Sequence, residues 1–395
     1  MRLQKWAGVV IAMSLLGQQI LAAGCANQGA TFRGTFKIGL VAPFSGMNSA
    51  IGYNMLFAAK LAISEWNDSD RLKGYRIELL AQDDRIEAVA GLTQAKKMSL
   101  DYDVLGVVGH PSSASAFAAA AAYSKAGLAM ITTEASADTL STGDYPGVFR
   151  LSASDSQVQA ETIKFISTTL KAQKLAVVAD PQAEHSRFSD QLNEKLLISR
   201  MSSIISETLK PDQTDFSGLA QRMAASAPQV VVFKGDYLNA GSLLSQMRLS
   251  KVGSAYIADI GSLNALFLKT AGNSAEGSYL IAPALSPTDI PSAAGFVLAY
   301  RAISGLDPLP SAALTYDGVN LILTAFERSL NGTPDGARPD RQSVIQAIGV
   351  LRDYPGLSSN ITFDQNGGVR GAKVYFYRIT GLRFPGEMVK PANAS

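Results

Sequence analysis

Two adjacent serines stand where a predicted buried strand ends and a predicted helix begins. The stretch VVGHPSSASAFAAAAAY, residues 107–123, opens with a β-branched run that stops at Gly109, and an alanine-rich helix follows Ser112 and Ser113. A serine at a helix start offers its hydroxyl beside free backbone N–H groups at the positive end of the helix, which suits a carboxylate. The same serines also suit plain helix capping, so both interpretations stay open.

Other polar residues follow predicted strands in the same way. The carboxyl ends of parallel strands meet at one edge of a sheet, and ligands of open α/β sheets bind beyond that edge. We therefore expect the functional residues to be among those directly after the strands. These are Pro43–Ser45, Asp83–Asp84, His110–Ser113, Thr132–Ser136, Asp180–Phe188, Lys234–Tyr237 and Asp259–Ser262.

The side chains that usually carry catalysis are scarce. The chain has two histidines, His110 and His185, and one cysteine, Cys25. No zinc-ligand spacing, GxSxG elbow or GxGxxG fingerprint occurs, so we expect no metal or cofactor. Asp83–Asp84 could hold a divalent cation, but acids at a strand end more often serve as caps. A nucleophile built from Ser113 and His110 would lack a third member.

Alternating strands and helices must position the polar edge. FKIGLVA (36–42) is typical of a buried strand and GYNMLFAAKLAISEWN (52–67) of a helix, and the alternation begins again after Asp155. This order predicts parallel sheets with right-handed crossovers. The 395 residues suit two domains, so the fold class is α/β with two Rossmann-like lobes. Near the end, NITFD and AKVYFYRIT favour an antiparallel pair around a turn at 364–368.

The N-terminus has the features of an export signal. Arg2 and Lys5 precede an apolar run too short for a comfortable membrane span, which predicts a signal peptide over residues 1–24. LAAGC around Cys25 resembles a bacterial lipobox, in which the cysteine is lipidated after cleavage. An ordinary secretory signal cut nearby is the alternative. Cys25 is the only cysteine, so it has no intrachain disulfide partner, which favours lipidation.

Composition and charge exclude other classes of protein. With 47% hydrophobic and 17% charged residues, the chain is globular and not disordered. The formal charge is +2, and Arg2 and Lys5 lie in the acid-free predicted signal, so the rest of the chain is neutral. We expect no nucleic-acid partner and no attraction to an anionic membrane surface.

An ordered series of motifs across the chain resembles one family. IGLVAPFSG, DD before an alanine-spaced helix, VVGHPSS, MITTEAS, FKGDY and SAEG resemble the leucine/isoleucine/valine-binding proteins, type I periplasmic solute-binding proteins that serve ABC importers. The likeness runs from about residue 36 to the last strand. It implies two lobes joined by three hinge crossings near 152, 283 and 359. Lobe I would be residues 36–152 plus 283–358, and lobe II residues 153–282 plus 359–395.

The resemblance also implies a ligand site between the lobes. Ser113, next to Ser112, and Ser136 match the residues that hold the ligand carboxylate in the family. Tyr237 matches a tyrosine of the opposite lobe that closes over the ligand. The alternatives are that the serines are helix caps and that the ring of Tyr237 lies in the core.

Three positions depart from the family pattern. Glu134 stands where the family has a small residue, so either it turns to solvent or the ligand brings a cation to this side. Ile260 occupies the position of the acid that pairs with the ligand ammonium, and Asp259 lies one residue earlier. His185 falls near a family tyrosine and is either a ligand donor or a surface residue. The ligand need not be leucine; another amino acid, an amide or another small polar molecule remains open.

The function that these residues and the resemblance favour is binding. We expect an exported substrate-binding protein, in the periplasm or cell envelope and anchored by lipid at Cys25, which delivers an amino acid-like solute to the membrane permease of an ABC importer. The alternative is a ligand-sensing or cell-envelope regulatory module of the same fold. An enzyme of unrecognised type is a third possibility.

Overall fold

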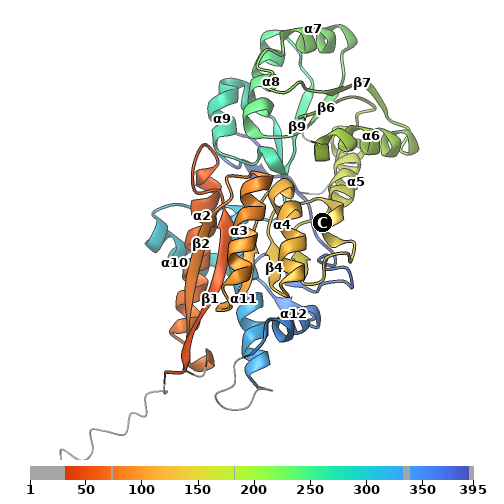
Figure 1. Ribbon diagram of the computed structural model, residues 1–395. Coiled ribbons are helices and arrows are strands. Elements are labelled where there is room, and N and C mark those ends of the chain that lie inside the picture. The colour runs from red at the N-terminus through yellow and green to blue at the C-terminus, as the bar shows by residue number, and fades with distance from the viewer. Residues whose placement is uncertain (1–31, 73, 182, 332–338, 391–395) are drawn as a thin grey trace, which may run out of the picture.

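The structure is a computed structural model that describes residues 32–72, 74–181, 183–331 and 339–390. Two lobes lie one above the other in Figure 1, each built on its own sheet. Across the described ranges, no helix combines the length and apolar character that a membrane span requires.

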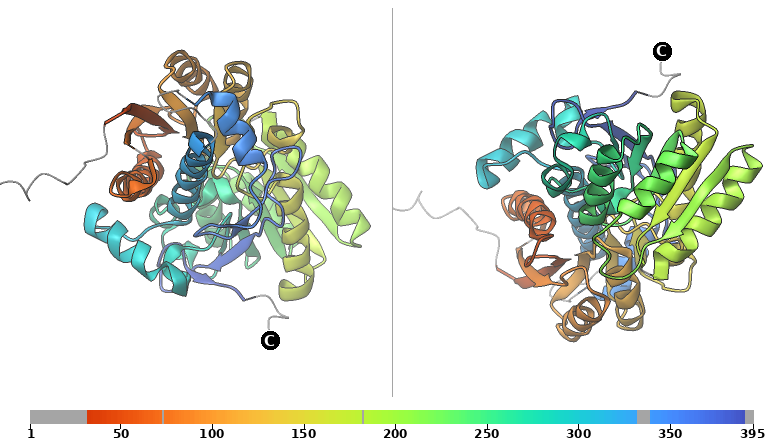
Figure 2. Two further views of the ribbon diagram at one scale, coloured as in Figure 1. Left: turned by 90° about the horizontal axis from the view of Figure 1, so that it is seen from below. Right: turned by 90° about the horizontal axis from the view of Figure 1, so that it is seen from above.

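The first lobe contains a five-stranded parallel sheet in the order β2-β1-β3-β4-β5. Its helices cover both faces (Figures 1 and 2). The strands are β1 (Gly34–Ala42), β2 (Tyr75–Asp83), β3 (Val104–Gly109), β4 (Ala129–Thr132) and β5 (Val148–Arg150). The helices are α2 (Ser49–Asn67), α3 (Ala88–Leu100), α4 (Ser113–Lys125), α10 (Ala294–Ser304), α11 (Pro310–Asn331) and α12 (Arg341–Gly349).

The second lobe contains a seven-stranded mixed sheet in the order β14-β13-β10-β9-β8-β6-β7. Five of its strands are parallel, and β13 and β14 extend one edge in antiparallel fashion. The strands are β6 (Lys174–Ala179), β7 (Ser202–Thr208), β8 (Val230–Lys234), β9 (Ala255–Ala258), β10 (Tyr279–Ala282), β13 (Tyr375–Arg378) and β14 (Glu387–Met388). The helices are α5 (Asp155–Phe165), α6 (Ala183–Ile198), α7 (Ser217–Ser226), α8 (Tyr237–Leu249) and α9 (Leu266–Ala271).

Alternating side chains place each parallel strand between two apolar layers. In β8, Val231 and Phe233 pack with α7, α8 and α9, whereas Val230 and Val232 pack with α5 and α6. All five residues of β8 are buried, as expected for a parallel strand covered on both faces. The predicted α/β class with two lobes around parallel sheets is confirmed.

The final predicted hairpin forms only in part. A turn closes at 364–368, because the N–H of Asp364 donates to the carbonyl of Gly368 at 2.8 Å. The flanking segments nevertheless find other partners, so the predicted pairing was wrong. β12 (Asn360–Ile361) pairs with β11 (Tyr354–Pro355), and β13 pairs with β10 and β14.

Packing shows where the chain passes between the two cores. β5 ends at Arg150, while Ala153 packs in the core of the second lobe. β10 ends at Ala282, while Ala284 packs in the core of the first lobe. These contacts favour crossings near 152 and 283.

Core packing favours a third crossing later in the chain than the resemblance implied. Ile361, Phe363 and Val369 all pack in the core of the first lobe, and the ring of Phe363 lies 4.9 Å from that of Phe149. The next strand, β13, belongs to the second sheet. We therefore propose a crossing between residues 369 and 375, in place of one near 359.

Candidate ligand-binding site

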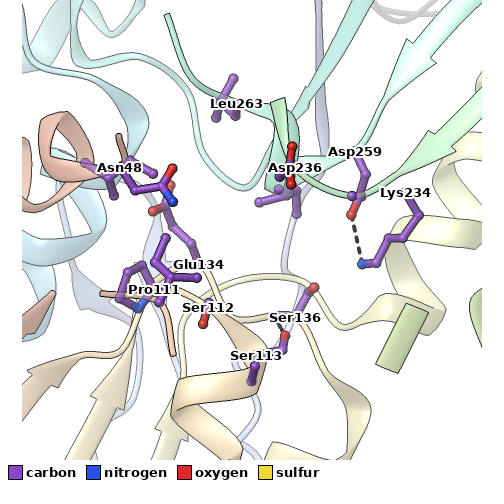
Figure 3. Close-up of a pocket in the computed structure, with 16 residues that line it drawn as sticks. Asn48, Pro111, Ser112, Ser113, Glu134, Ser136, Lys234, Asp236, Asp259 and Leu263 are labelled. Atoms are coloured by element: carbon purple, nitrogen blue, oxygen red, sulfur yellow. Dashed lines mark hydrogen bonds and ion pairs between the residues drawn. The ribbon is translucent and has the colours of Figure 1, made fainter. Parts of the chain in front are cut away.

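A cavity of about 130 Å³ lies between the two lobes, at the carboxyl ends of their strands. Both lobes line it, as the close-up in Figure 3 shows. Five of the predicted site residues take part, namely Ser112, Ser113, Glu134, Ser136 and Asp259. The structure adds two charged residues that the prediction did not name as ligand contacts, Lys234 and Asp236.

Two glycines allow close contacts within each lobe at the strand ends near the cavity. Gly109 ends β3 with φ +125°, and a Cβ there would lie 2.0 Å from the carbonyl oxygen of Val41 in β1. Gly235 follows β8 with φ +156°, and a Cβ there would lie 2.1 Å from a carboxylate oxygen of Asp180. Any other residue at either position would push neighbouring backbone or side chains out of place.

The two serines at the start of α4 accept hydrogen bonds from different segments of the chain. Ser112 is the N-cap, and its Oγ accepts the N–H of Ser115 at 3.2 Å. The Oγ of Ser113 accepts the N–H groups of Ser136 and Ala137, both at 3.1 Å, which fixes the loop after β4 to α4. The O–H of Ser113 therefore remains the group that this side chain can donate to a ligand.

His110 does not line the cavity, and its contacts do not form a nucleophilic pair with Ser113. It is fully buried, with Nδ1 2.9 Å from Asp84 Oδ2 and Nε2 3.2 Å from the Tyr123 hydroxyl. Both ring nitrogens thus have partners away from Ser113. No group of three or more His, Cys, Asp or Glu side chains suited to a metal occurs within the described ranges.

The two acids at the end of β2, Asp83 and Asp84, hold a strained loop against the cavity. Asp83 Oδ1 accepts the N–H of Arg85 at 2.9 Å, and Asp84 Oδ1 accepts the N–H of Ile86 at 3.1 Å. Arg85 and Ile86 have φ values of +50° and +62°, and a β-branched residue rarely adopts the second. The loop places Ile86 in the cavity wall, which the sequence alone did not indicate.

Two carboxylates reach the cavity from opposite lobes. Glu134, in the loop after β4, is partly buried and has no hydrogen bond or ion pair with any described residue. Burial raises the pKa of Glu134 to about 7. Asp236 caps α8 from the second lobe, where its Oδ1 accepts the N–H groups of Leu238 and Asn239. Its Oδ2 has no hydrogen-bond partner among the described residues.

Lys234 connects two further carboxylates beneath the cavity. Its side chain is 6% exposed, and Nζ lies 2.8 Å from Asp155 Oδ1 and 2.8 Å from Asp259 Oδ2. Burial opposes the charged ammonium, but Asp155 and Asp259 outweigh it and raise the pKa of Lys234. The same Asp155 oxygen accepts the Ser136 hydroxyl at 2.8 Å. Ser136 and Asp259 therefore line the cavity while already bound to other residues of the protein, Ser136 to Asp155 and Asp259 to Lys234.

Three predicted residues do not join this group. Tyr237 packs in the core of the second lobe, 3% exposed, does not line the cavity, and its hydroxyl has no hydrogen-bond partner among the described residues. His185 lies in the first turn of α6, but its side chain is outside the described part of the chain. Cys25 is also outside the described residues. The sequence had placed Lys234–Tyr237 at this edge, and the charged members of that run, not the aromatic one, face the cavity.

Known proteins resemble this chain over most of its length. The family described as periplasmic binding protein matches residues 35–383. An amino acid binding protein of Pseudomonas aeruginosa is 27% identical over 290 residues, which is 73% of this chain and 77% of that protein. The Leu/Ile/Val-binding protein of Escherichia coli K12 is 24% identical over 362 residues, 91% and 95% of the two chains.

Solved structures agree in fold. The isoleucine complex of a branched-chain amino acid transporter substrate binding protein from Streptococcus pneumoniae has a TM-score of 0.79 at 24% identity, covering 90% of this chain and 100% of that one. A leucine binding protein from Thermotoga maritima also has a TM-score of 0.79, at 23% identity, covering 88% and 96%. With two lobes, a cavity between their strand ends and a family match over residues 35–383, this chain belongs to the periplasmic binding protein family.

Proposed function

We propose that this protein is the exported substrate-binding protein of an ABC importer and closes its two lobes around an amino acid or similar small polar solute. The observation that carries the proposal is the cavity lined by strand ends of both lobes. The names of the relatives in Pseudomonas aeruginosa and Escherichia coli and the isoleucine complex from Streptococcus pneumoniae support this class of ligand.

Closure follows from contacts that a solute makes with both lobes at once. A ligand shifts an equilibrium between open and closed forms only by its difference in affinity for the two. On the first lobe, the Ser113 hydroxyl and the N-terminus of α4 suit an anionic group of the solute. On the second lobe, Asp236 and the backbone at Gly235 and Gly261 lie across the cavity. A solute that touches both sides therefore stabilises the closed form.

Delivery to a membrane partner belongs to the same proposal. Residues 1–24 direct export, Cys25 carries a lipid anchor, and the closed protein passes its solute to a permease. Mass spectrometry of the protein purified from its native membrane should show a mature N-terminus at Cys25 with a diacylglycerol attached. An unmodified mature chain that begins elsewhere would remove the anchor from the proposal and leave the binding function standing.

Calorimetry with the standard amino acids and their amides tests the binding function. At least one solute should bind with a dissociation constant of about 1 μM to 1 mM or tighter, and small-angle scattering should show a more compact protein when that solute is present. A strain without the gene should then lose uptake of the solute, and the intact gene should restore it. Binding with unchanged uptake would support the sensory alternative, and a panel without any binding would contradict the proposal.

A further inference from the structure

The charges around the cavity point to the class of solute, on the basis of the proposed function. We propose that the ligand carries a net positive charge and that Glu134 of the first lobe and Asp236 of the second lobe hold its cationic nitrogen between them. A cationic amino acid, a guanidinium compound and a polyamine share this chemistry.

The lining of the cavity is acidic, with one basic residue. Glu134, Asp236 and Asp259 contribute carboxylates, and Lys234 is the only lysine or arginine among the described lining residues. Lys234 is already engaged, because its Nζ lies 2.8 Å from both Asp155 and Asp259. Its charge is therefore not available to neutralise Glu134 or Asp236. A ligand with no net charge would leave these two carboxylates uncompensated in a closed cleft, which is costly.

Glu134 and Asp236 also differ from the other acids in what they bind. Glu134 has no partner among the described residues, and one oxygen of Asp236 has no hydrogen-bond partner among them, while the other caps α8. In Figure 3, Glu134 extends from the first lobe into the cavity, and Asp236 lies across it on the second lobe. Two ionised carboxylates that approach across a closing cleft repel each other. A cation between them turns that repulsion into attraction and so drives closure.

The residues that the resemblance assigned to the ligand carboxylate are also less suited to an anion here. The Ser136 hydroxyl donates to Asp155 at 2.8 Å, so an internal carboxylate occupies a donor that the resemblance assigned to the ligand. Of the two serines that the resemblance assigned to the carboxylate, only Ser113 keeps an O–H without an acceptor among the described residues. The rest of the wall is largely apolar, with Ile51, Ile86 and Leu263 beside the charged groups. The cavity therefore offers more to a cation than to an anion.

Matched pairs of solutes test this inference by calorimetry on the mature protein. L-Arginine and L-citrulline have nearly the same shape and differ in charge, and L-lysine and L-norleucine differ by the side-chain ammonium. We expect the charged member of at least one pair to bind about tenfold tighter or more, the scale of a hydrogen bond to a charged group. Agmatine and putrescine, which lack a carboxylate, distinguish a cationic amino acid from a simple amine as the source of the charge.

Two variants and two matched controls locate the effect. Glu134→Gln and Asp236→Asn should each reduce affinity for the charged solute by about tenfold or more. The ratio between the affinities for the charged and the neutral member of the pair should fall as well. Glu78→Gln in the first lobe and Glu387→Gln in the second remove the same charge from exposed positions outside the cavity, so they should leave affinity unchanged. Circular dichroism confirms that each variant is folded.

The outcomes separate this inference from the function on which it rests. Tight binding of leucine, citrulline or glutamate with none of the cationic solutes would overturn the inference and leave a substrate-binding protein. The inference would also be overturned if Glu78→Gln and Glu387→Gln lost as much affinity as Glu134→Gln and Asp236→Asn. The loss would then follow from the total charge of the protein and not from carboxylates in the cavity. Absence of binding by every solute in both panels would overturn the inference together with the proposed function.

Discussion

Asp155 and Lys234 form a 2.8 Å ion pair within the second lobe, beside the first crossing. Asp155 is the first residue of α5 in the second lobe, yet its N–H donates to the Ser136 carbonyl at 2.7 Å and its carboxylate accepts the Ser136 hydroxyl. Lys234 ends β8 and also binds Asp259. A loop of the first lobe is thus joined, through one carboxylate, to the strand end that forms the opposite wall.

Removal of the buried ammonium should be strongly destabilising. Lys234→Met removes the ammonium that Asp155 and Asp259 share, and loss of one partner from a buried ion pair costs about 3–5 kcal/mol. Urea unfolding should show a correspondingly lower midpoint. Lys164→Met removes an exposed lysine that pairs with Glu161, and should cost about 0.5 kcal/mol or less. Similar effects of both substitutions would contradict the network as described.

Tyr237 should matter for packing and not for ligand contact. Its hydroxyl has no partner among the described residues, so Tyr237→Phe should leave both stability and ligand affinity nearly unchanged. Tyr237→Ala should cost about 3–5 kcal/mol, as truncation of a large buried aromatic usually does. Thermal unfolding and calorimetry measure the two effects. A marked loss of affinity in Tyr237→Phe would restore the role that the resemblance implied.

The two serines of α4 should separate into a cap and a site residue. Ser112→Ala removes the cap of α4 and should cost about 0.5–2 kcal/mol of stability, with little effect on binding. Ser113→Ala removes the acceptor of two backbone N–H groups and the remaining O–H donor, so it should lower stability by about 1–3 kcal/mol and weaken a carboxylate-bearing solute. If calorimetry showed weaker binding by Ser112→Ala than by Ser113→Ala, Ser112 and not Ser113 would be the residue that contacts the solute.

The unliganded protein should become more stable as pH falls from about 7.5 to 5.5. Burial raises the pKa of Glu134 from 4.5 to about 7 and, with Asp236 adding to it, the pKa of Asp180 from 3.8 to about 7. The folded state therefore binds more protons than the unfolded state in this range, and stability rises on acidification. Below about pH 4 the trend reverses, because the hydrogen bonds that lower the pKa of carboxylates such as Asp83 are lost.

Glu134→Gln isolates one contribution to this pH dependence. The variant should show a shallower rise in denaturation midpoint between pH 7.5 and 5.5, while Glu78→Gln should keep the slope of the parent protein. Binding of L-arginine by the parent should release protons near pH 7, because the bound cation favours ionised Glu134. Calorimetry in buffers of different ionisation enthalpy measures this release, and its absence together with an unchanged slope would show that Glu134 is ionised throughout.

The prediction of the fold succeeded where local pattern decides structure. The apolar run at residues 36–42 predicted a buried strand, and β1 forms there. A short run is enough to predict the element, because the spacing of apolar residues over a few neighbouring positions distinguishes a strand from a helix. Ser154 and Gln157 have the three-residue spacing of a capping box, and the box forms at the start of α5. The later position that we propose for the third crossing could not be inferred in this way, because nothing local distinguishes a strand of one sheet from a strand of the other.

By itself, the sequence determined the α/β class, the order of elements and the edge at which the polar residues gather, because each depends on local periodicity and chain order. Tertiary structure decided which of those residues face the cavity and which are already paired. Asp155 and Lys234 are 79 residues apart, so no local pattern reveals that this lysine takes up both Asp155 and Asp259. One position along the start of α8 separates Asp236 in the cavity wall from Tyr237 in the core, because adjacent helical side chains point in different directions.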